Sequence, residues 1–168
     1  MKRLWAPWRM DYIRSPKPTG CVFCNLLDEQ EDQQNLILYR GKTCFVVLNR
    51  YPYTNGHLMV APLVHVDAPE KLADNVLQEM MQLVNTCTAA LRATMRPDGF
   101  NIGMNIGKAA GAGIEDHIHM HIVPRWAGDT NFMPVCADTR VIVESLRDCY
   151  ARLKPAFDQL ISPNAASE

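Results

Sequence analysis

Short apolar runs alternate with turn residues along the first third of the chain. Leu36–Tyr39 and Thr43–Leu48 are separated by a short polar stretch that contains Gly41, and this length and composition are typical of a hairpin. A third run, His57–Pro62, follows a connection that holds proline, asparagine and glycine, residues that favour a tight turn. The pattern predicts three consecutive β-strands.

The middle of the chain has the spacing of an amphipathic helix. Steps of four, four, three, four and four residues separate the members of one apolar stripe: Leu72, Val76, Met80, Leu83, Cys87 and Leu91. We expect this helix to start at Asp67, with Pro69 in its first turn. It should end near Arg96, because Pro97 disfavours helix in the residue before it.

Two more strands are predicted after the long helix. Residues 100–106 alternate between apolar and polar or small residues. Residues 117–123 alternate more strictly, so that three histidines share one face and Ile118, Met120 and Ile122 share the other. We expect the two strands to pair with each other, and Pro124 to end the second.

The carboxyl-terminal part returns to helical spacing over residues 140–153, with Val143, Leu146 and Tyr150 on one side. After Pro155 the residues become small and polar, which is typical of a loosely packed tail. The order of elements predicts an α+β fold: a five-stranded antiparallel sheet with one long helix and a carboxyl-terminal helix.

Size and charge narrow the range of functions. The 168 residues suit one compact domain, and 17 basic against 18 acidic residues give a net charge of −1. This balance offers no broad basic surface, so we expect neither nucleic acid nor a membrane as partner.

The first residues lack the apolar run of a signal peptide, and most cysteines stand singly among apolar residues, so we expect a cytoplasmic protein with free thiols.

The histidines are the strongest chemical signal. His117, His119 and His121 form a row on one strand face, and the chain has only two others, His57 and His65. A solvated strand face or a metal site of alternating histidines are the alternatives to a chemical role. The preceding residues 107–113 are mostly glycine and alanine, which is typical either of a flexible turn or of a loop whose N–H groups bind an anion. Their closeness to the histidines favours a phosphate loop.

Cys21 and Cys24 have the spacing of half a four-ligand zinc site, which requires two further nitrogen or sulfur ligands. The alternative is a pair of buried thiols without a metal. Residues 1–19 have no clear period, and we interpret them as an extended arm. Its Trp5 and Trp8 would pack on the domain, across a dimer interface or on a nucleotide.

The stretch from His117 to Val123 resembles the signature of the histidine triad family, in which three histidines alternate with apolar residues. Leu48–Val60 resembles the family's first nucleotide-binding strand pair, and Gly20–Cys24 resembles the amino-terminal signature of its zinc-containing members. The similarity covers roughly residues 20–135. We therefore divide the chain into an arm at 1–19, a histidine triad domain at 20–135, and a carboxyl-terminal helix and tail at 136–168.

The resemblance implies specific roles for single residues. His119 would attack the α-phosphorus of a nucleotide to form a nucleotidyl-histidine, His121 would donate to phosphate oxygens, and His57 would support the site by hydrogen bonding. Asn49 would contact the ribose hydroxyls. Further donors to the phosphates would be the side-chain amide of Asn105 and the backbone N–H groups of the glycine loop, at Gly111, Ala112 and Gly113. A structural Zn²⁺ would be held by Cys21, Cys24, His65 and His117, with no organic cofactor.

The chain departs from some branches of the family in the glycine loop, where small residues around Ala112 and Gly113 replace glutamine and serine or threonine. The ending from Pro124 to Phe132 looks like the bacterial branch that includes diadenosine tetraphosphate phosphorylases. We expect a homodimeric enzyme, its sheet extended across the interface, that transfers AMP from a dinucleoside polyphosphate to phosphate or water. The alternatives are a purine nucleoside phosphoramidase, and a non-catalytic nucleotide sensor or zinc-stapled interaction protein.

Overall fold

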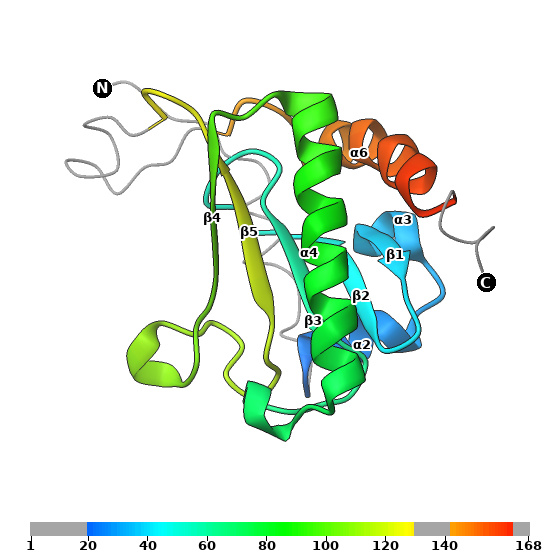
Figure 1. The fold of residues 1–168 in the computed structure, drawn as a ribbon, viewed down its shortest axis with the longest axis vertical. Helices are drawn as coiled ribbons and strands as arrows, with labels where there is room; N and C mark the ends of the chain where they lie inside the picture. The colour runs from blue at the N-terminus through cyan, green and yellow to red at the C-terminus, as the bar shows by residue number, and fades with distance from the viewer. Residues whose placement is uncertain (1–19, 130–141, 163–168) are drawn as a thin grey trace, which may run out of the picture.

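The computed structural model describes residues 20–129 and 142–162. Its five antiparallel strands form one sheet in the order β1-β2-β3-β5-β4 (Figure 1). The strands are β1 (Ile37–Arg40), β2 (Cys44–Leu48), β3 (Leu58–Pro62), β4 (Gly99–Met104) and β5 (Met120–Arg125). The helices are α2 (Val22–Asp28), α3 (Asp32–Asn35), α4 (Asp74–Met95) and α6 (Leu146–Ile161), with 3₁₀ turns η1 (Pro69–Lys71) and η2 (Lys108–Ala110). The predicted α+β class, the hairpin and the pairing of β4 with β5 are confirmed.

The sheet separates two apolar layers. Alternate residues of β2 and β3, such as Val46 and Val60, face α4 and α6, which cross one side of the sheet (Figure 1). The intervening residues, such as Phe45 and Met59, face the other side and pack with Phe23 of α2. Ile118 and Ile122 belong to the first layer. Because successive side chains alternate across a strand, the three histidines between and beside them are directed to the α2 side.

The hairpin between β1 and β2 is fastened to α4 by one carboxylate. Glu79 accepts hydrogen bonds from the backbone N–H of Lys42 at 2.8 Å and of Thr43 at 2.6 Å, and also from the Thr43 hydroxyl. Gly41 lies against the same carboxylate, so a Cβ at this position would collide with it. The glycine of the predicted turn therefore serves close approach of the hairpin to the helix.

The predicted start of the long helix was wrong. Asp67 precedes a short 3₁₀ turn, and Leu72 then has an extended backbone, so that α4 begins at Asp74 with Ala73 as its N-cap. Leu72 is nevertheless buried in the same core as the helical stripe, which explains why its spacing matched. The predicted end is correct, because Arg96 caps the helix in a left-handed conformation before Pro97.

The carboxyl-terminal helix lies further along the chain than predicted. Residues 140 and 141 fall outside the described residues, Val143 is 81% exposed, and α6 begins after Ser145, whose hydroxyl accepts from the N–H of Asp148. The helix then passes through Pro155 to Ile161 instead of ending in a tail. Burial of Phe157 beyond the proline offsets the hydrogen bond that proline cannot make.

Pro124 also fails to end its strand. It pairs with Phe100 of β4, whereas pairing between β3 and β5 stops at Ile122. The missing N–H therefore removes no bond to β3. The strand itself begins at Met120, so His117 and His119 precede its regular part. Helix α2 was not predicted, and across the described ranges no helix has the length and apolar character needed to cross a membrane.

Candidate active site and metal centre

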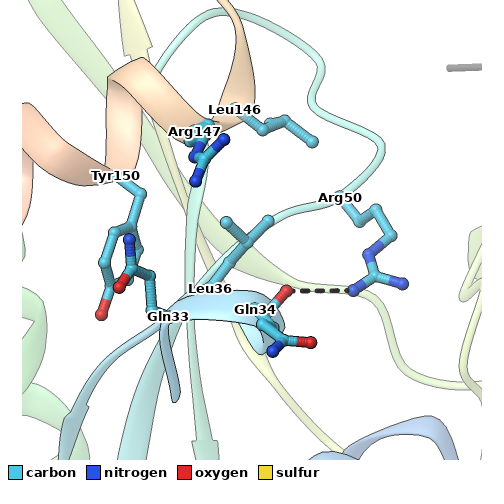
Figure 2. A pocket seen from close by; sticks show the side chains of 7 residues that line it. All are labelled: Gln33, Gln34, Leu36, Arg50, Leu146, Arg147 and Tyr150. Carbon is cyan, nitrogen blue, oxygen red and sulfur yellow. Dashed lines mark hydrogen bonds between the residues drawn. The ribbon is translucent and has the colours of Figure 1, made fainter. Parts of the chain in front are cut away.

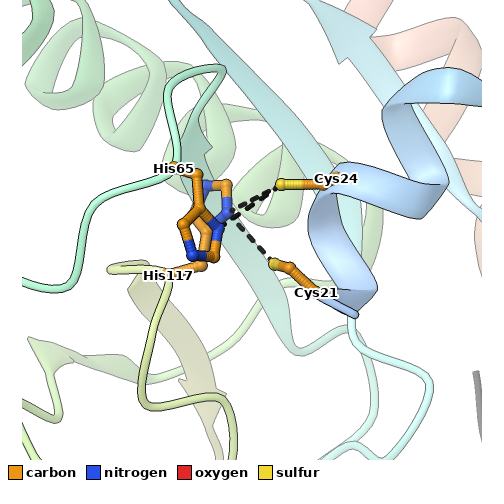
Figure 3. Close-up of side chains that lie close together, drawn as sticks. All are labelled: Cys21, Cys24, His65 and His117. Atoms are coloured by element: carbon orange, nitrogen blue, oxygen red, sulfur yellow. Dashed lines mark hydrogen bonds between the residues drawn. The ribbon is translucent and has the colours of Figure 1, made fainter. Parts of the chain in front are cut away.

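Four predicted ligands meet at the amino-terminal end of α2. The side chains of Cys21 and Cys24 point from this end toward the rings of His65 and His117 (Figure 3), and the four ligand atoms all lie within 4.8 Å of one another. Sγ of Cys21 is 3.3 Å from Nδ1 of His117, and Sγ of Cys24 is 3.4 Å from Nδ1 of His65. Sulfur and nitrogen ligands of one tetrahedral zinc ion stand about 3.6 Å apart. The cluster could therefore hold a metal ion.

The environments of His117 and Cys24 are compatible with binding of a cation. Nε2 of His117 lies 2.9 Å from the carbonyl oxygen of Pro62, to which it must donate, and this leaves Nδ1 with a lone pair directed at the thiols. Burial lowers the pKa of His117, which favours the neutral, ligating ring. Burial and the adjacent Cys21 raise the pKa of the Cys24 thiol, and a bound cation would favour its thiolate form.

His119 presents one nitrogen for chemistry. Its Nδ1 lies 2.9 Å from the carbonyl oxygen of His117, which fixes the proton on Nδ1 and leaves Nε2 with a lone pair. The ring is 4% exposed and packs edge-on against Phe23, and its burial lowers its pKa. Among the described residues, every fully buried side-chain nitrogen or oxygen has a hydrogen-bond partner. Nε2 of His119 has no such partner among these residues, so this atom is not fully buried and is accessible to solvent. His119 is not one of the four residues of the Cys/His cluster that could hold a metal ion.

A chain of hydrogen bonds fixes the tautomer of His121. The N–H of Tyr51 donates to Oδ1 of Asn49 at 2.9 Å, so the Asn49 amide nitrogen faces Nδ1 of His57, 3.2 Å away. The N–H of Tyr53 also donates to this Nδ1, at 3.1 Å. Nδ1 of His57 is thus an acceptor, and the opposite Nε2 donates to Nδ1 of His121 at 3.0 Å. Neutral His121 therefore carries its proton on Nε2.

The neutral state of His121 follows from its position. It is 8% exposed, and burial, with a smaller contribution from His119, lowers the pKa of His121 to about 4. The two rings lie 4.7 Å apart. Near neutral pH the site therefore offers one nucleophilic nitrogen, on His119, beside one N–H donor, on His121.

Two contributors to this site were not predicted. Tyr53 stacks on His57 and His121, with ring centroids at 4.6 and 5.7 Å, in addition to its backbone hydrogen bond. Phe23 forms the wall behind His117 and His119. In the sequence, Tyr53 lies in the connection before His57, and Phe23 lies between the two cysteines. No local pattern marks an aromatic ring that contacts histidines distant in the sequence.

The remaining predicted substrate-binding residues differ in how they are placed relative to the histidines. The amide of Asn105 lies 3.5 Å from Nε2 of His121. Asn49 has both amide atoms engaged with Tyr51 and His57, so its predicted contact with a ribose stays a prediction. The loop that contains Gly111, Ala112 and Gly113 joins β4 to the segment that carries the histidines (Figure 1). Gly111 has a φ of +84°, which favours glycine, whereas Gly113 does not require it.

The comparison with known protein families agrees with this geometry. The family model described as the HIT domain matches residues 30–128, more than half of the chain. The protein belongs to the HIT family. An AP-4-A phosphorylase of Mycobacterium tuberculosis is 37% identical over 156 residues, which cover 88% of this chain and 80% of that protein.

Solved structures of HIT proteins have the same fold. A Zn-bound histidine triad family protein of Mycobacterium smegmatis superposes with a TM-score of 0.69 at 28% identity, over 86% of this chain and 97% of that one. A hypothetical histidine triad nucleotide-binding protein of Sulfolobus tokodaii superposes with a TM-score of 0.66 at 24% identity, over 85% of this chain and 93% of that one. The predicted family is confirmed. This HIT protein combines a Cys/His cluster and a histidine row that share the segment from His117 to His121.

Proposed function

We propose that this HIT protein transfers AMP from a dinucleoside polyphosphate, such as diadenosine tetraphosphate, by way of a nucleotidyl-histidine at His119. One observation carries the proposal. The carbonyl of His117 holds the proton of His119 on Nδ1, and Nε2 is left as an unpartnered lone pair beside the N–H of His121. A neutral imidazole of this kind is a nucleophile at neutral pH.

The reaction would proceed in two displacements. Nε2 of His119 attacks the α-phosphorus, the bond from that phosphorus to the bridging oxygen breaks, and ATP leaves with the electron pair of that bond. Nε2 of His121 donates its hydrogen bond to a phosphate oxygen as charge moves, and the amide of Asn105 lies near enough to assist. An oxygen of the acceptor then attacks the same phosphorus, the bond from phosphorus to Nε2 breaks, and its electron pair returns to the imidazole of His119.

The acceptor is orthophosphate in this proposal, and ADP is the product. The name of the mycobacterial relative, AP-4-A phosphorylase, supports this choice over water. The small residues at Gly111, Ala112 and Gly113 are consistent with it, because they bring no bulky side chain to the loop beside the histidines. Their backbone N–H groups are proposed to bind the phosphates.

Product analysis tests the proposal directly. With diadenosine tetraphosphate and orthophosphate, we expect ADP and ATP in equal amounts. AMP and ATP would show hydrolysis, and unchanged substrate with bound nucleotide would show a sensor instead of an enzyme. His119→Ala should abolish turnover but keep nucleotide binding, whereas Gln82→Ala, on the exposed side of α4, should behave as the wild type. Turnover by the His119→Ala variant would remove this residue from the nucleophile role.

We propose that the metal of the Cys/His cluster is zinc. Two thiolates and two imidazoles are the ligand set that zinc prefers in closed structural sites, and the Zn-bound HIT neighbour supports the assignment. Zinc held there would tie α2 to the segment that carries His119. Metal analysis of purified protein should give one zinc ion per chain, and the double variant Cys21→Ala/Cys24→Ala should give none.

We propose further that two copies pair through β4, which is an edge of the sheet. Asn101, Ile102 and Gly103, in the middle of this strand, are all exposed, and Ile102 is 46% exposed. Such an edge is a template for pairing with another strand. Light scattering should give a dimer for the wild type and a monomer for Ile102→Arg.

We also propose a cytoplasmic location, because none of the described cysteines forms a disulfide, as is usual in a reducing compartment. The division into an arm, a domain at 20–135 and a terminal segment is kept as part of the proposal. Trp5 and Trp8 lie outside the described residues.

A further inference from the structure

A second cavity lies on the opposite side of the sheet from the histidines. It has a volume of about 440 Å³ and opens between α3, the start of α6 and the residue that follows Asn49 (Figure 2). Leu36 and Tyr150 line it, and both belong to the apolar layer beneath α4 and α6. The triad instead packs with Phe23 in the other layer. The cavity is therefore separate from the proposed active site.

Two guanidinium groups line this cavity without acidic partners. Arg50 follows β2, and its one hydrogen bond to another described residue is a long one, 3.5 Å, to the carbonyl oxygen of Gln34. Arg147 lies in the first turn of α6. Within the described ranges, no carboxylate lies within ion-pair distance of either. By contrast, Arg40, Arg125 and Arg152 each have a carboxylate oxygen at 2.8 Å or less.

Two acidic residues close in sequence to the residues that line the cavity, Glu31 and Asp148, form hydrogen bonds with other side chains. Glu31 accepts from the side-chain amide of Gln34, and Asp148 accepts from the hydroxyl of Ser145. Like charges that line one cavity repel each other, and an anion between them removes that repulsion. A phosphate monoester has three acceptor oxygens, enough to bind two guanidinium groups at once, and arginine suits such a group better than lysine does.

The rest of the cavity describes the body of the ligand. Leu36 is 8% exposed and Tyr150 is 6% exposed, and they form an apolar part of a wall that also includes the side-chain amides of Gln33 and Gln34. The Tyr150 hydroxyl donates to the carbonyl of Ile37 at 3.1 Å, which holds its ring in place. The volume is in the range of small-molecule sites, about 300 to 1,000 Å³. A flat ring with apolar faces and hydrogen-bonding groups at its edge fits this mixed wall better than a sugar covered with hydroxyls.

We infer that this cavity is a second ligand site, which takes a phosphate monoester with a flat ring, of the nucleoside monophosphate class, held by Arg50 and Arg147. The inference does not depend on the proposed catalysis. The site would bind such a ligand whether or not His119 transfers a nucleotide.

Amide chemical shifts of the full-length protein distinguish this site from the triad. We expect AMP to shift the amide signals of Gln34, Leu36 and Arg147 in a saturable way, separately from any shifts at the histidines. Inorganic phosphate and adenosine, which each supply half of the ligand, should bind there at least about tenfold more weakly than AMP, as should glucose 6-phosphate.

Variants then assign the anion contact. Arg147→Ala should weaken AMP binding at these amides about tenfold or more, because a charge-assisted hydrogen bond is lost. The AMP affinity of Arg147→Lys, which keeps the charge, should lie between those of the wild type and Arg147→Ala. The control Arg92→Ala removes an exposed arginine of α4 that lies over Phe100 and should change nothing at the cavity.

Three results would overturn the inference. The first is the absence of AMP shifts at Gln34, Leu36 and Arg147 while the triad responds. The second is an Arg147→Ala protein, folded by its other signals, that binds AMP there with unchanged affinity. The third is equal binding of glucose 6-phosphate and AMP, which would eliminate the role of the apolar wall.

Discussion

Lowering the pH should destabilise the folded protein through His121. The unfolded ring has a pKa of about 6.5, whereas in the folded protein burial, with a smaller contribution from His119, lowers this pKa to about 4. Between these two values the unfolded chain binds a proton that the folded protein excludes. The resulting stability is therefore fully present above pH 6.5 and is lost as the pH falls through 4.

The magnitude follows from the two pKa values. Between pH 7 and pH 4 the free energy of unfolding should fall by about 3 kcal/mol on account of His121 alone. A smaller part of the pKa shift comes from His119, which titrates as well, so the expected decrease in the free energy of unfolding is about 2 to 3 kcal/mol. This is a large share of the stability of a small domain, about 5 to 15 kcal/mol.

Urea unfolding of the wild type and of His121→Gln isolates this contribution. The variant lacks the titrating ring but keeps the other histidines, so their effects largely cancel when the two proteins are compared at each pH. We expect the difference in the free energy of unfolding to shrink by about 2 to 3 kcal/mol between pH 7 and pH 4. A difference that stays constant over this range would refute a depressed pKa for His121.

Three further changes test other parts of the structure. His57→Phe keeps an aromatic ring but removes the acceptor that faces Asn49 and Tyr53 and the donor to His121. The free energy of unfolding should fall by about 2 to 4 kcal/mol, and turnover should fall at least about tenfold. Unchanged kinetics would contradict the hydrogen-bond chain. Glu79→Gln should lower the free energy of unfolding in urea by about 2 kcal/mol with activity retained, because the hairpin loses a charge-assisted acceptor. Unchanged stability would show that the contact between Glu79 and the hairpin is unimportant. Removal of metal with a chelator should lower the melting temperature of the wild type but not of Cys21→Ala/Cys24→Ala, and an equal response of both proteins would argue against the metal centre.

Local patterns were sufficient where the information lies within a few residues. Alternation from His117 to Ile122 correctly assigned histidines and apolar residues to opposite faces, since an extended chain has no other way to place them. The spacing of Cys21 and Cys24, together with the family resemblance, named all four members of the Cys/His cluster. Boundaries were less well predicted, as the start of α4 and the path of α6 through Pro155 show, because burial of Leu72 and Phe157 outweighed local preferences.

The sequence by itself determined the fold class, the family and the residue types of the site. Only the tertiary structure decided how those residues are protonated and supported. The carbonyls of His117 and Pro62 select one tautomer each, and the N–H of Tyr53 acts on His121 through His57. The cavity between Arg50 and Arg147 also exists only in the folded chain, because 97 positions separate them in the printed sequence. A hydrogen bond or an electrostatic contact depends on distance in space, and periodicity along the chain carries no information about such distances between remote residues.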